Sequence, residues 1–245
     1  MIQTTWHERV AVLALDRPAS LNALDPELLH ALGTAMSDAL DGHATALVLT
    51  GTGRAFSAGA DLRWFAQRSA QGVEAQRIAL KEMLEAGGSV VRAILEAPVP
   101  VVSAINGPCI GGALGIALAA DVALAGRSAY FSLPQVPQLG IVPDLGASWL
   151  LPRLVGRPRA MGMSLFGDRI HAGQAEQWGM VWKCVDDADL QAQALSIARQ
   201  LAAAPAQAVI GTRRLLDEAF ACPMEQQLSE EGRRQMDLVK PLAAR

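Results

Sequence analysis

The sequence predicts an α/β fold, because apolar runs that suit buried strands alternate with segments of helical spacing as far as Pro143. Beyond Pro143 the pattern changes: nearly every segment has helical spacing, and only 180–185 resembles a strand. We therefore expect an α/β core over residues 1–185, followed by a helical C-terminal region over residues 186–245.

Composition supports a folded domain and excludes several classes of protein. Of 245 residues, 51% are hydrophobic and 18% are charged, which is enough apolar surface for a core and excludes a disordered chain. The formal net charge of -3 gives no attraction to polyanions, so we expect no nucleic-acid partner. The three cysteines are far apart and the four histidines lack ligand spacing, so we expect neither a disulfide framework nor a metal site.

The N-terminal residues 1–9 are polar and carry no apolar signal core. The longest apolar stretch, 111–120, is too short to cross a bilayer. We therefore expect a protein of the cytoplasm with no membrane partner.

The first predicted strand is the continuous apolar run 10–15 (VAVLAL), which ends at the turn residues Asp16, Arg17 and Pro18. A helix is expected next, since Asp25 is a favoured N-cap residue and Pro26 suits a first helical turn. The following elements are a strand at 46–49, a loop at 54–61, a helical region at 73–96 broken at Gly87-Gly88, strands at 99–105, 122–125 and 130–131, and a helix at 111–120.

The C-terminal part is expected to consist of helices, with a strand at 180–185. Their predicted bounds are 144–155, 157–166, 172–178, 189–204, 207–220 and 224–239.

Two glycine-containing segments each follow a buried strand and precede a predicted helix. They are 57–61 (SAGAD) and Gly111-Gly112. Small residues let a ligand approach the backbone, and N–H groups at helix N-termini favour negative charge. Two such N–H groups meeting at one oxygen would form an oxyanion hole. Tight turns and close helix–sheet packing would explain the same residues, so spacing alone leaves both interpretations open.

Asp144 lies among apolar residues in the segment 139–145 (LGIVPDL). It could cap the helix that follows, or act as a general base whose pKa is raised by desolvation. Other chemistry has less support: the chain contains no P-loop and no GxGxxG motif, and Ser57 lacks the first glycine of a nucleophile elbow.

Taken together, these segments resemble the crotonase family, the enoyl-CoA hydratase/isomerase superfamily, over almost the whole chain. The motifs that carry the resemblance are 15–18 (LDRP), 21–24 (LNAL), 55–62 (AFSAGADL), 104–112 (AINGPCIGG), 151–156 (LPRLVG), 172–175 (AGQA) and 178–181 (WGMV). The resemblance implies a spiral of ββα units, assembled as a homotrimer or a dimer of trimers. It also implies acyl-CoA thioester substrates, with coenzyme A entering as part of the substrate and no separate cofactor.

The resemblance further implies an enolate held by the backbone N–H groups of Ala60 and Gly112. The substrate-binding residues that it implies are Ala23, Leu24, Ala58, Ala60, Asp61, Leu62, Gly111 and Gly112. From the residues alone, Asp61 is interpreted as a structural residue beside a helix.

This chain departs from the hydratases of the family at both of their glutamate positions, which here are Gly115 and Gln135. Glycine cannot donate a proton and glutamine has no usable basicity, so we expect a poor hydratase. The segment 142–144 (VPD) instead resembles the isomerase branch, in particular the ring-opening enoyl-CoA isomerases of phenylacetate breakdown. That likeness makes Asp144 the single catalytic base, even if it also caps a helix.

We therefore expect an acyl-CoA double-bond isomerase. An enoyl-CoA hydratase and a non-catalytic acyl-CoA binder are the alternatives. An RNA-binding role is disfavoured by the acidic composition, and a hydrolase or dehalogenase would need a nucleophile that we cannot place. Members of the family usually continue into a last helix that helps to cover coenzyme A, whereas this sequence stops at Arg245, so we expect coenzyme A cover and subunit contacts to be reduced.

Overall fold

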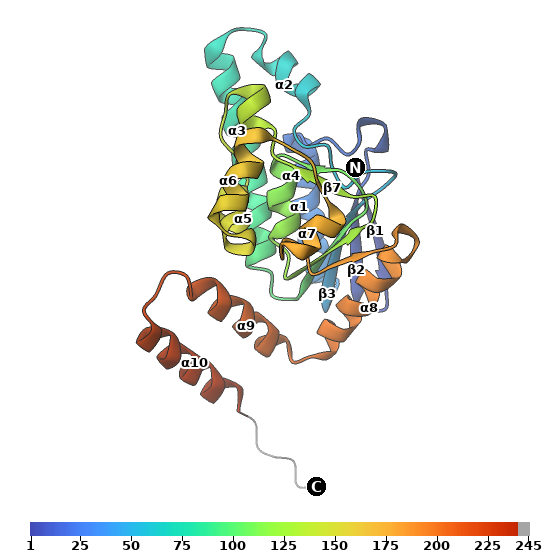
Figure 1. The fold of residues 1–245 in the computed structure, drawn as a ribbon. Coiled ribbons are helices and arrows are strands. Elements are labelled where there is room, and N and C mark those ends of the chain that lie inside the picture. The colour runs from blue at the N-terminus through green and yellow to red at the C-terminus, as the bar shows by residue number, and fades with distance from the viewer. Residues whose placement is uncertain (240–245) are drawn as a thin grey trace.

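The computed structural model of the chain describes residues 1–239 and contains two β-sheets (Figure 1). The larger sheet has the strand order β1-β2-β3-β4-β6-β9, in which β1 and β2 are antiparallel and all other neighbours are parallel. Its strands are β1 (Ile2–His7), β2 (Val10–Leu15), β3 (Ala46–Gly51), β4 (Val101–Ile105), β6 (Val122–Gly126) and β9 (Lys183–Val185). The smaller sheet has the order β5-β7-β8 and consists of β5 (Cys109–Ile110), β7 (Tyr130–Ser132) and β8 (Ile170–His171).

Helices cover both faces of the larger sheet, which confirms the predicted α/β class. The described residues form ten α-helices. They are α1 (Pro26–Asp41), α2 (Leu62–Ser69), α3 (Val73–Leu95), α4 (Gly112–Leu118), α5 (Ala147–Val155), α6 (Arg157–Phe166), α7 (Ala172–Gln177), α8 (Leu190–Ala203), α9 (Ala206–Glu218) and α10 (Met224–Leu238). As predicted, Asp25 caps α1, since its carboxylate accepts a hydrogen bond from the N–H of Leu28 at 2.8 Å.

Strand β2 and the first four residues of β3 are apolar without interruption because both faces of these strands are covered. Successive side chains of a strand point to opposite faces. Leu13 and Leu47 accordingly belong to the main core with α1 and α3, whereas Val12 and Val48 pack in a second core against α8. The continuous apolar runs are therefore the sequence signature of a parallel sheet buried on both sides.

Helix α3 corrects the prediction of a break at Gly87-Gly88, since it runs unbroken from Val73 to Leu95. Gly87 is instead a point of close packing. A Cβ placed on it would lie 2.5 Å from Cδ2 of Leu145, so only glycine leaves room for that side chain. The helix expected after segment 57–61, whose bounds periodicity did not give, is α2. It begins after Asp61, and the Asp61 carboxylate accepts hydrogen bonds from the N–H groups of Arg63 and Trp64.

The region after residue 185 is helical, as predicted, and its helices differ in their surroundings. Helix α8 covers one face of the sheet, and Ala194 and Ala198 are fully buried there. Helices α9 and α10 lie away from the sheet (Figure 1). The division of the chain at residue 185 stays a prediction, because nothing tests it. Within residues 1–239 we find no helix that combines the length and the apolar character needed to span a membrane.

A buried arginine attaches α9 to the body of the molecule. The guanidinium of Arg213 donates to both carboxylate oxygens of Asp121, at 2.6 and 2.7 Å. It also donates to the backbone carbonyls of Leu95, the last residue of α3, and of Ala97 and Val99 in the segment that follows. These bonds hold α9 against the loop that precedes β4.

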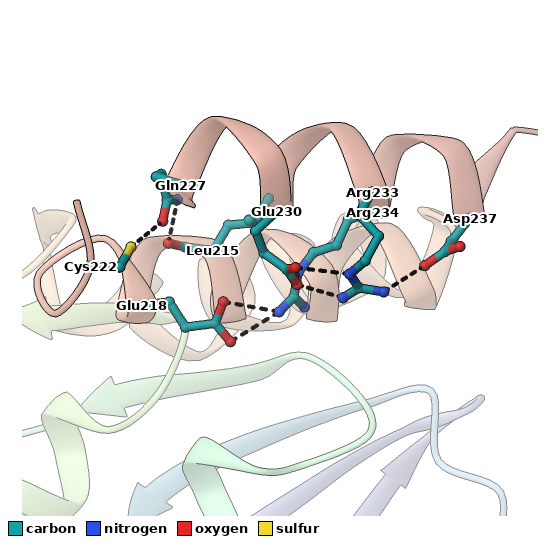
Figure 2. Close-up of polar contacts among 8 residues, drawn as sticks. All are labelled: Leu215, Glu218, Cys222, Gln227, Glu230, Arg233, Arg234 and Asp237. Atoms are coloured by element: carbon teal, nitrogen blue, oxygen red, sulfur yellow. Dashed lines mark hydrogen bonds and ion pairs between the residues drawn. The ribbon is translucent and has the colours of Figure 1, made fainter. Parts of the chain in front are cut away.

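Helices α9 and α10 are joined to each other by polar contacts (Figure 2). Arg234 on α10 donates to both carboxylate oxygens of Glu218 on α9, at 3.0 and 3.1 Å. Gln227 donates to the carbonyl of Leu215 at 3.0 Å and accepts from the thiol of Cys222.

Candidate active site

Two loops that are distant in sequence lie side by side, and they bring the two glycine-containing segments together. The N–H of Ser57 donates to the carbonyl of Pro108 at 3.0 Å, and the N–H of Ile110 donates to the carbonyl of Ser57 at 3.1 Å. Gly59 has φ +84°, and a Cβ on it would lie 2.7 Å from the carbonyl oxygen of Ile110. A glycine is therefore required where the two loops touch.

The N–H groups of Ala60 and Gly112 have no hydrogen-bond acceptor within residues 1–239. Their neighbours do: the N–H of Asp61 donates to Leu24, and that of Gly111 donates to Ser132. Gly112 is the first residue of α4, where an N–H group has no partner inside the helix. Both groups are thus free to bind an anionic oxygen, although their role as an oxyanion hole stays a prediction.

The other predicted binding residues surround these two N–H groups. Leu24 and Ala60 form a β-bridge, and the N–H of Ala58 donates to the carbonyl of Leu21 at 2.9 Å. Segments 23–24, 58–62 and 111–112 are therefore contiguous, with Ala23 and Leu24 buried and Leu62 exposed. The carboxylate of Asp61 caps α2 and accepts from Arg17 at 3.1 Å, in agreement with its structural interpretation.

Asp144 lies beside this site, in the loop before α5. A Cβ on Gly112 would lie 3.1 Å from Oδ1 of Asp144, so the carboxylate faces the first turn of α4. The expectation that Asp144 also caps a helix is wrong, because α5 begins at Ala147 and its N-cap residue is Gly146. Asp144 contributes only its backbone carbonyl there, which accepts from the N–H of Ala147 at 2.9 Å.

The Asp144 side chain is half-buried, and burial raises its pKa above the ordinary value of an aspartate. A hydrogen bond opposes this effect: Nε2 of Gln135 donates to Oδ1 of Asp144 at 3.3 Å. A carboxylate with a raised pKa is a stronger base than an exposed one, which suits proton abstraction near neutral pH.

The loop that carries Asp144 is held by Leu145, which occupies a slot lined by glycines. Leu145 has φ 45°, and its side chain contacts the positions where Gly87 and Gly112 would carry a Cβ. Its backbone passes still closer to α4, since a Cβ on Gly115 would lie 1.9 Å from the carbonyl oxygen of Leu145. Position 115 therefore has no room for any side chain while Asp144 is in this place.

Gln135 is a functional candidate that sequence reasoning missed. It begins the π-helical turn Gln135–Leu139, is 4% exposed and hydrogen-bonds Asp144. The sequence marked position 135 as a departure from the hydratases, but only its lack of basicity was considered. A buried amide in place of an acid was the available signal.

The polar groups gathered here are one half-buried carboxylate, one buried amide and two free N–H groups. Residues 1–239 contain no cluster of three or more His, Cys, Asp or Glu side chains that could hold a metal ion. A carboxylate next to free N–H donors can exchange a proton with a carbon acid whose conjugate base carries its charge on oxygen.

Comparisons with known proteins agree with this arrangement. The family model described as "Enoyl-CoA hydratase/isomerase" matches residues 5–242. A "Probable enoyl-CoA hydratase" of Rhodobacter capsulatus is 38% identical over 94% of this chain and 86% of its own length. The "1,2-epoxyphenylacetyl-CoA isomerase" of Escherichia coli is 35% identical over 91% and 84%, respectively. A crystal structure of an enoyl-CoA hydratase from Polaromonas sp. JS666 superposes with a TM-score of 0.88 at 30% identity, covering 96% of this chain and 90% of that one.

Proposed function

Because this chain belongs to the enoyl-CoA hydratase/isomerase family, whose fold it shares, we propose that it is an acyl-CoA double-bond isomerase. The observation that carries the proposal is the position of Asp144. It is a half-buried carboxylate beside Gly112, and its loop fills the space that a side chain at position 115 would need.

In the proposed mechanism Asp144 removes a proton from the carbon next to the thioester carbonyl of a 3-enoyl-CoA. The electron pair of that C–H bond enters the conjugated system, and the negative charge collects on the thioester oxygen. The N–H groups of Ala60 and Gly112 bind this oxygen, and loss of one such donor costs about 2.7–4 kcal/mol of transition-state stabilisation in well-studied enzymes. Asp144 then returns the proton two carbons away, which yields the conjugated 2-enoyl-CoA.

One base is sufficient for this reaction because the carboxylate that removes a proton is regenerated when it delivers one. Addition of water to a double bond needs more, since water must be activated at one carbon and a proton delivered to the other. Position 115 offers no group for the second task, and Gln135 is an amide. Hydration is the second candidate, favoured by the name of the Rhodobacter relative, and a non-catalytic acyl-CoA binder is the third.

The substrate is proposed to enter as a coenzyme A thioester, with no separate cofactor and with the protein in the cytoplasm. The name of the Escherichia coli relative makes thioesters derived from phenylacetate a second substrate class to test.

The test is incubation in deuterated water with 3-enoyl-CoA, 2-enoyl-CoA and aryl-acetyl-derived CoA thioesters, with products identified by mass and NMR. We expect double-bond migration with deuterium exchange next to the thioester, and its loss in Asp144→Asn with binding retained. Asp38→Asn, at an exposed aspartate of α1, is the matched control. A product that has gained one water would favour the hydratase, and binding without exchange would favour the binder.

A further inference from the structure

Gln135 is buried more deeply than its polarity favours. Only 4% of the residue is exposed, and its amide oxygen Oε1 is buried without a hydrogen-bond partner in residues 1–239. Leaving such an acceptor unpaired costs free energy, so a buried glutamine with a free oxygen needs a reason. The amide nitrogen of Gln135 supplies that reason, because Nε2 donates a hydrogen bond to Oδ1 of Asp144 at 3.3 Å.

The amide and the Asp144 carboxylate both lie beside the segment that carries the free N–H group of Gly112. A Cβ on Gly111 would lie 3.6 Å from Nε2 of Gln135, and one on Gly112 would lie 3.1 Å from Oδ1 of Asp144. Gln135 and Asp144 therefore contact each other next to one N–H group of the candidate oxyanion hole. No other residue between 1 and 239 donates a side-chain hydrogen bond to the Asp144 carboxylate.

Charged groups do not compete with this contact. Helix α4 and the π-helical turn that begins at Gln135 carry no titratable side chain. On α3, the charged residues on either side of Gly87, Glu85 and Arg92, are exposed. On α5, Arg153 stacks on the ring of Trp149 at 3.7 Å. The pKa of Asp144 is thus raised by burial and lowered by hydrogen bonds, first from the Gln135 amide and then from its own backbone.

We propose that Gln135 is a positioning residue that keeps Asp144 hydrogen-bonded in both of its protonation states; this inference rests on the proposed function. The carboxylate needs a donor, and Nε2 is one. Once Asp144 has taken a proton it needs an acceptor, and a half-turn of the side-chain amide brings Oε1 to the position of Nε2. The oxygen that is unpaired in the resting protein would then be used during turnover.

Neither an acid nor an apolar residue could do this. A glutamate at position 135 would place a second negative charge beside Asp144, so the two groups would share a proton and titrate as a pair. A leucine would leave the carboxylate without its donor. An amide at position 135 can hydrogen-bond Asp144 without adding a second group that titrates, so Asp144 acts as a single base.

The experiment measures the pH dependence of kcat and KM for isomerisation in the parent, Gln135→Leu and Gln135→Glu. We expect Gln135→Leu to lower kcat about ten- to hundredfold with little change in KM, as expected for loss of a hydrogen bond to a charged group. Its acidic limb should move to higher pH, since the bond lowers the pKa of Asp144. The nearly isosteric Gln135→Glu should show two apparent pKa values. Gln138→Leu, at an exposed glutamine of the same turn, is the matched control and should change nothing.

A second measurement separates this inference from the proposed function. Carbon-13 NMR of the Asp144 carboxyl group, without substrate, should show a higher pKa in Gln135→Leu than in the parent. An unchanged pKa and an unchanged acidic limb would overturn the inference. A parent that isomerises no thioester would refute the proposed function, and the NMR titration would then decide the Gln135 contact by itself. If Gln135→Leu does not fold, the pH–rate profile and the NMR titration are both measured on Gln135→Glu.

Discussion

The glycine at position 115 offers a sharp test of how the Asp144 loop is held. Replacing it by alanine adds one methyl group, whose carbon would lie 1.9 Å from the carbonyl oxygen of Leu145 and 2.8 Å from its carbonyl carbon. Real Cβ atoms essentially never approach a heavy atom within 3.0 Å. The loop must therefore retreat by about 1 Å, and Asp144, the preceding residue, must move with it.

The size of the effect follows from that displacement. Overpacking a tight site costs about 1–3 kcal/mol, and an alanine inside a helix returns up to about 1 kcal/mol relative to glycine. We expect Gly115→Ala to lower the free energy of unfolding by about 1–2 kcal/mol. A shift of 1 Å in a catalytic group can cost about a hundredfold in rate, so isomerisation and deuterium exchange should fall by about that factor.

Urea unfolding measures the change in the free energy of unfolding, and deuterium exchange followed by NMR measures the change in rate. Helix α1 provides the control. Gly33 lies inside that helix, and a Cβ on it would meet nothing within 4 Å. Gly33→Ala should therefore raise stability by up to about 1 kcal/mol and leave the rate unchanged. Should Gly115→Ala prove as stable and as active as Gly33→Ala, the close contact with Leu145 would not exist.

Three further predictions concern the base, the oxyanion hole and the assembly. Burial raises the pKa of Asp144, so the ionised carboxylate destabilises the folded state at neutral pH. In urea unfolding, Asp144→Asn should therefore be more stable than the parent at neutral pH, and this difference in stability should vanish as the pH falls below the ordinary pKa of an aspartate. Gly112→Pro should lose turnover by on the order of 10²–10³, with circular dichroism as the check on folding; full activity would place the donor elsewhere. Sedimentation should show a homotrimer or a dimer of trimers, and a monomer throughout the micromolar range would contradict this; the motive is the exposed apolar side chains of the C-terminal region, Leu216, Phe220, Met224, Leu228 and Met236.

The sequence predicted the bounds of elements that neighbouring residues delimit. The bounds of β2 were predicted to the residue because a continuous apolar run marks this strand, and those of α6 because Gly156 and Gly167 stand at its two ends. A helix was expected after Asp61, but the bounds of α2 were not predicted, because none of its residues is buried and its apolar residues give no helical stripe. The break predicted in α3 relied on the low helix propensity of glycine, but packing against Leu145 explains Gly87 better.

The candidate site divides in the same way. The resemblance placed Ala60, Gly112 and Asp144 from local motifs, and the structure brings their segments together. The contact between Gln135 and Asp144 spans nine residues around an irregular turn, and no periodicity marks it. The carbonyl of Leu145 against Gly115 is a backbone contact between two elements, which the sequence shows only as an unexplained glycine.

The exclusion of a side chain at position 115 also constrains how such a site can evolve. A glutamate introduced there would displace the Asp144 loop before it could contribute chemistry, because the Leu145 carbonyl occupies its path. Retracting the loop first would move away the one carboxylate that lies beside Gly112 in the described part of the chain. Each single step would lose the proposed reaction without supplying another, so we expect the effects of the two changes to be strongly non-additive. A one-carboxylate site of this kind therefore converts to a two-carboxylate site only through coupled substitutions, or in a duplicated gene copy that is free to lose the first activity.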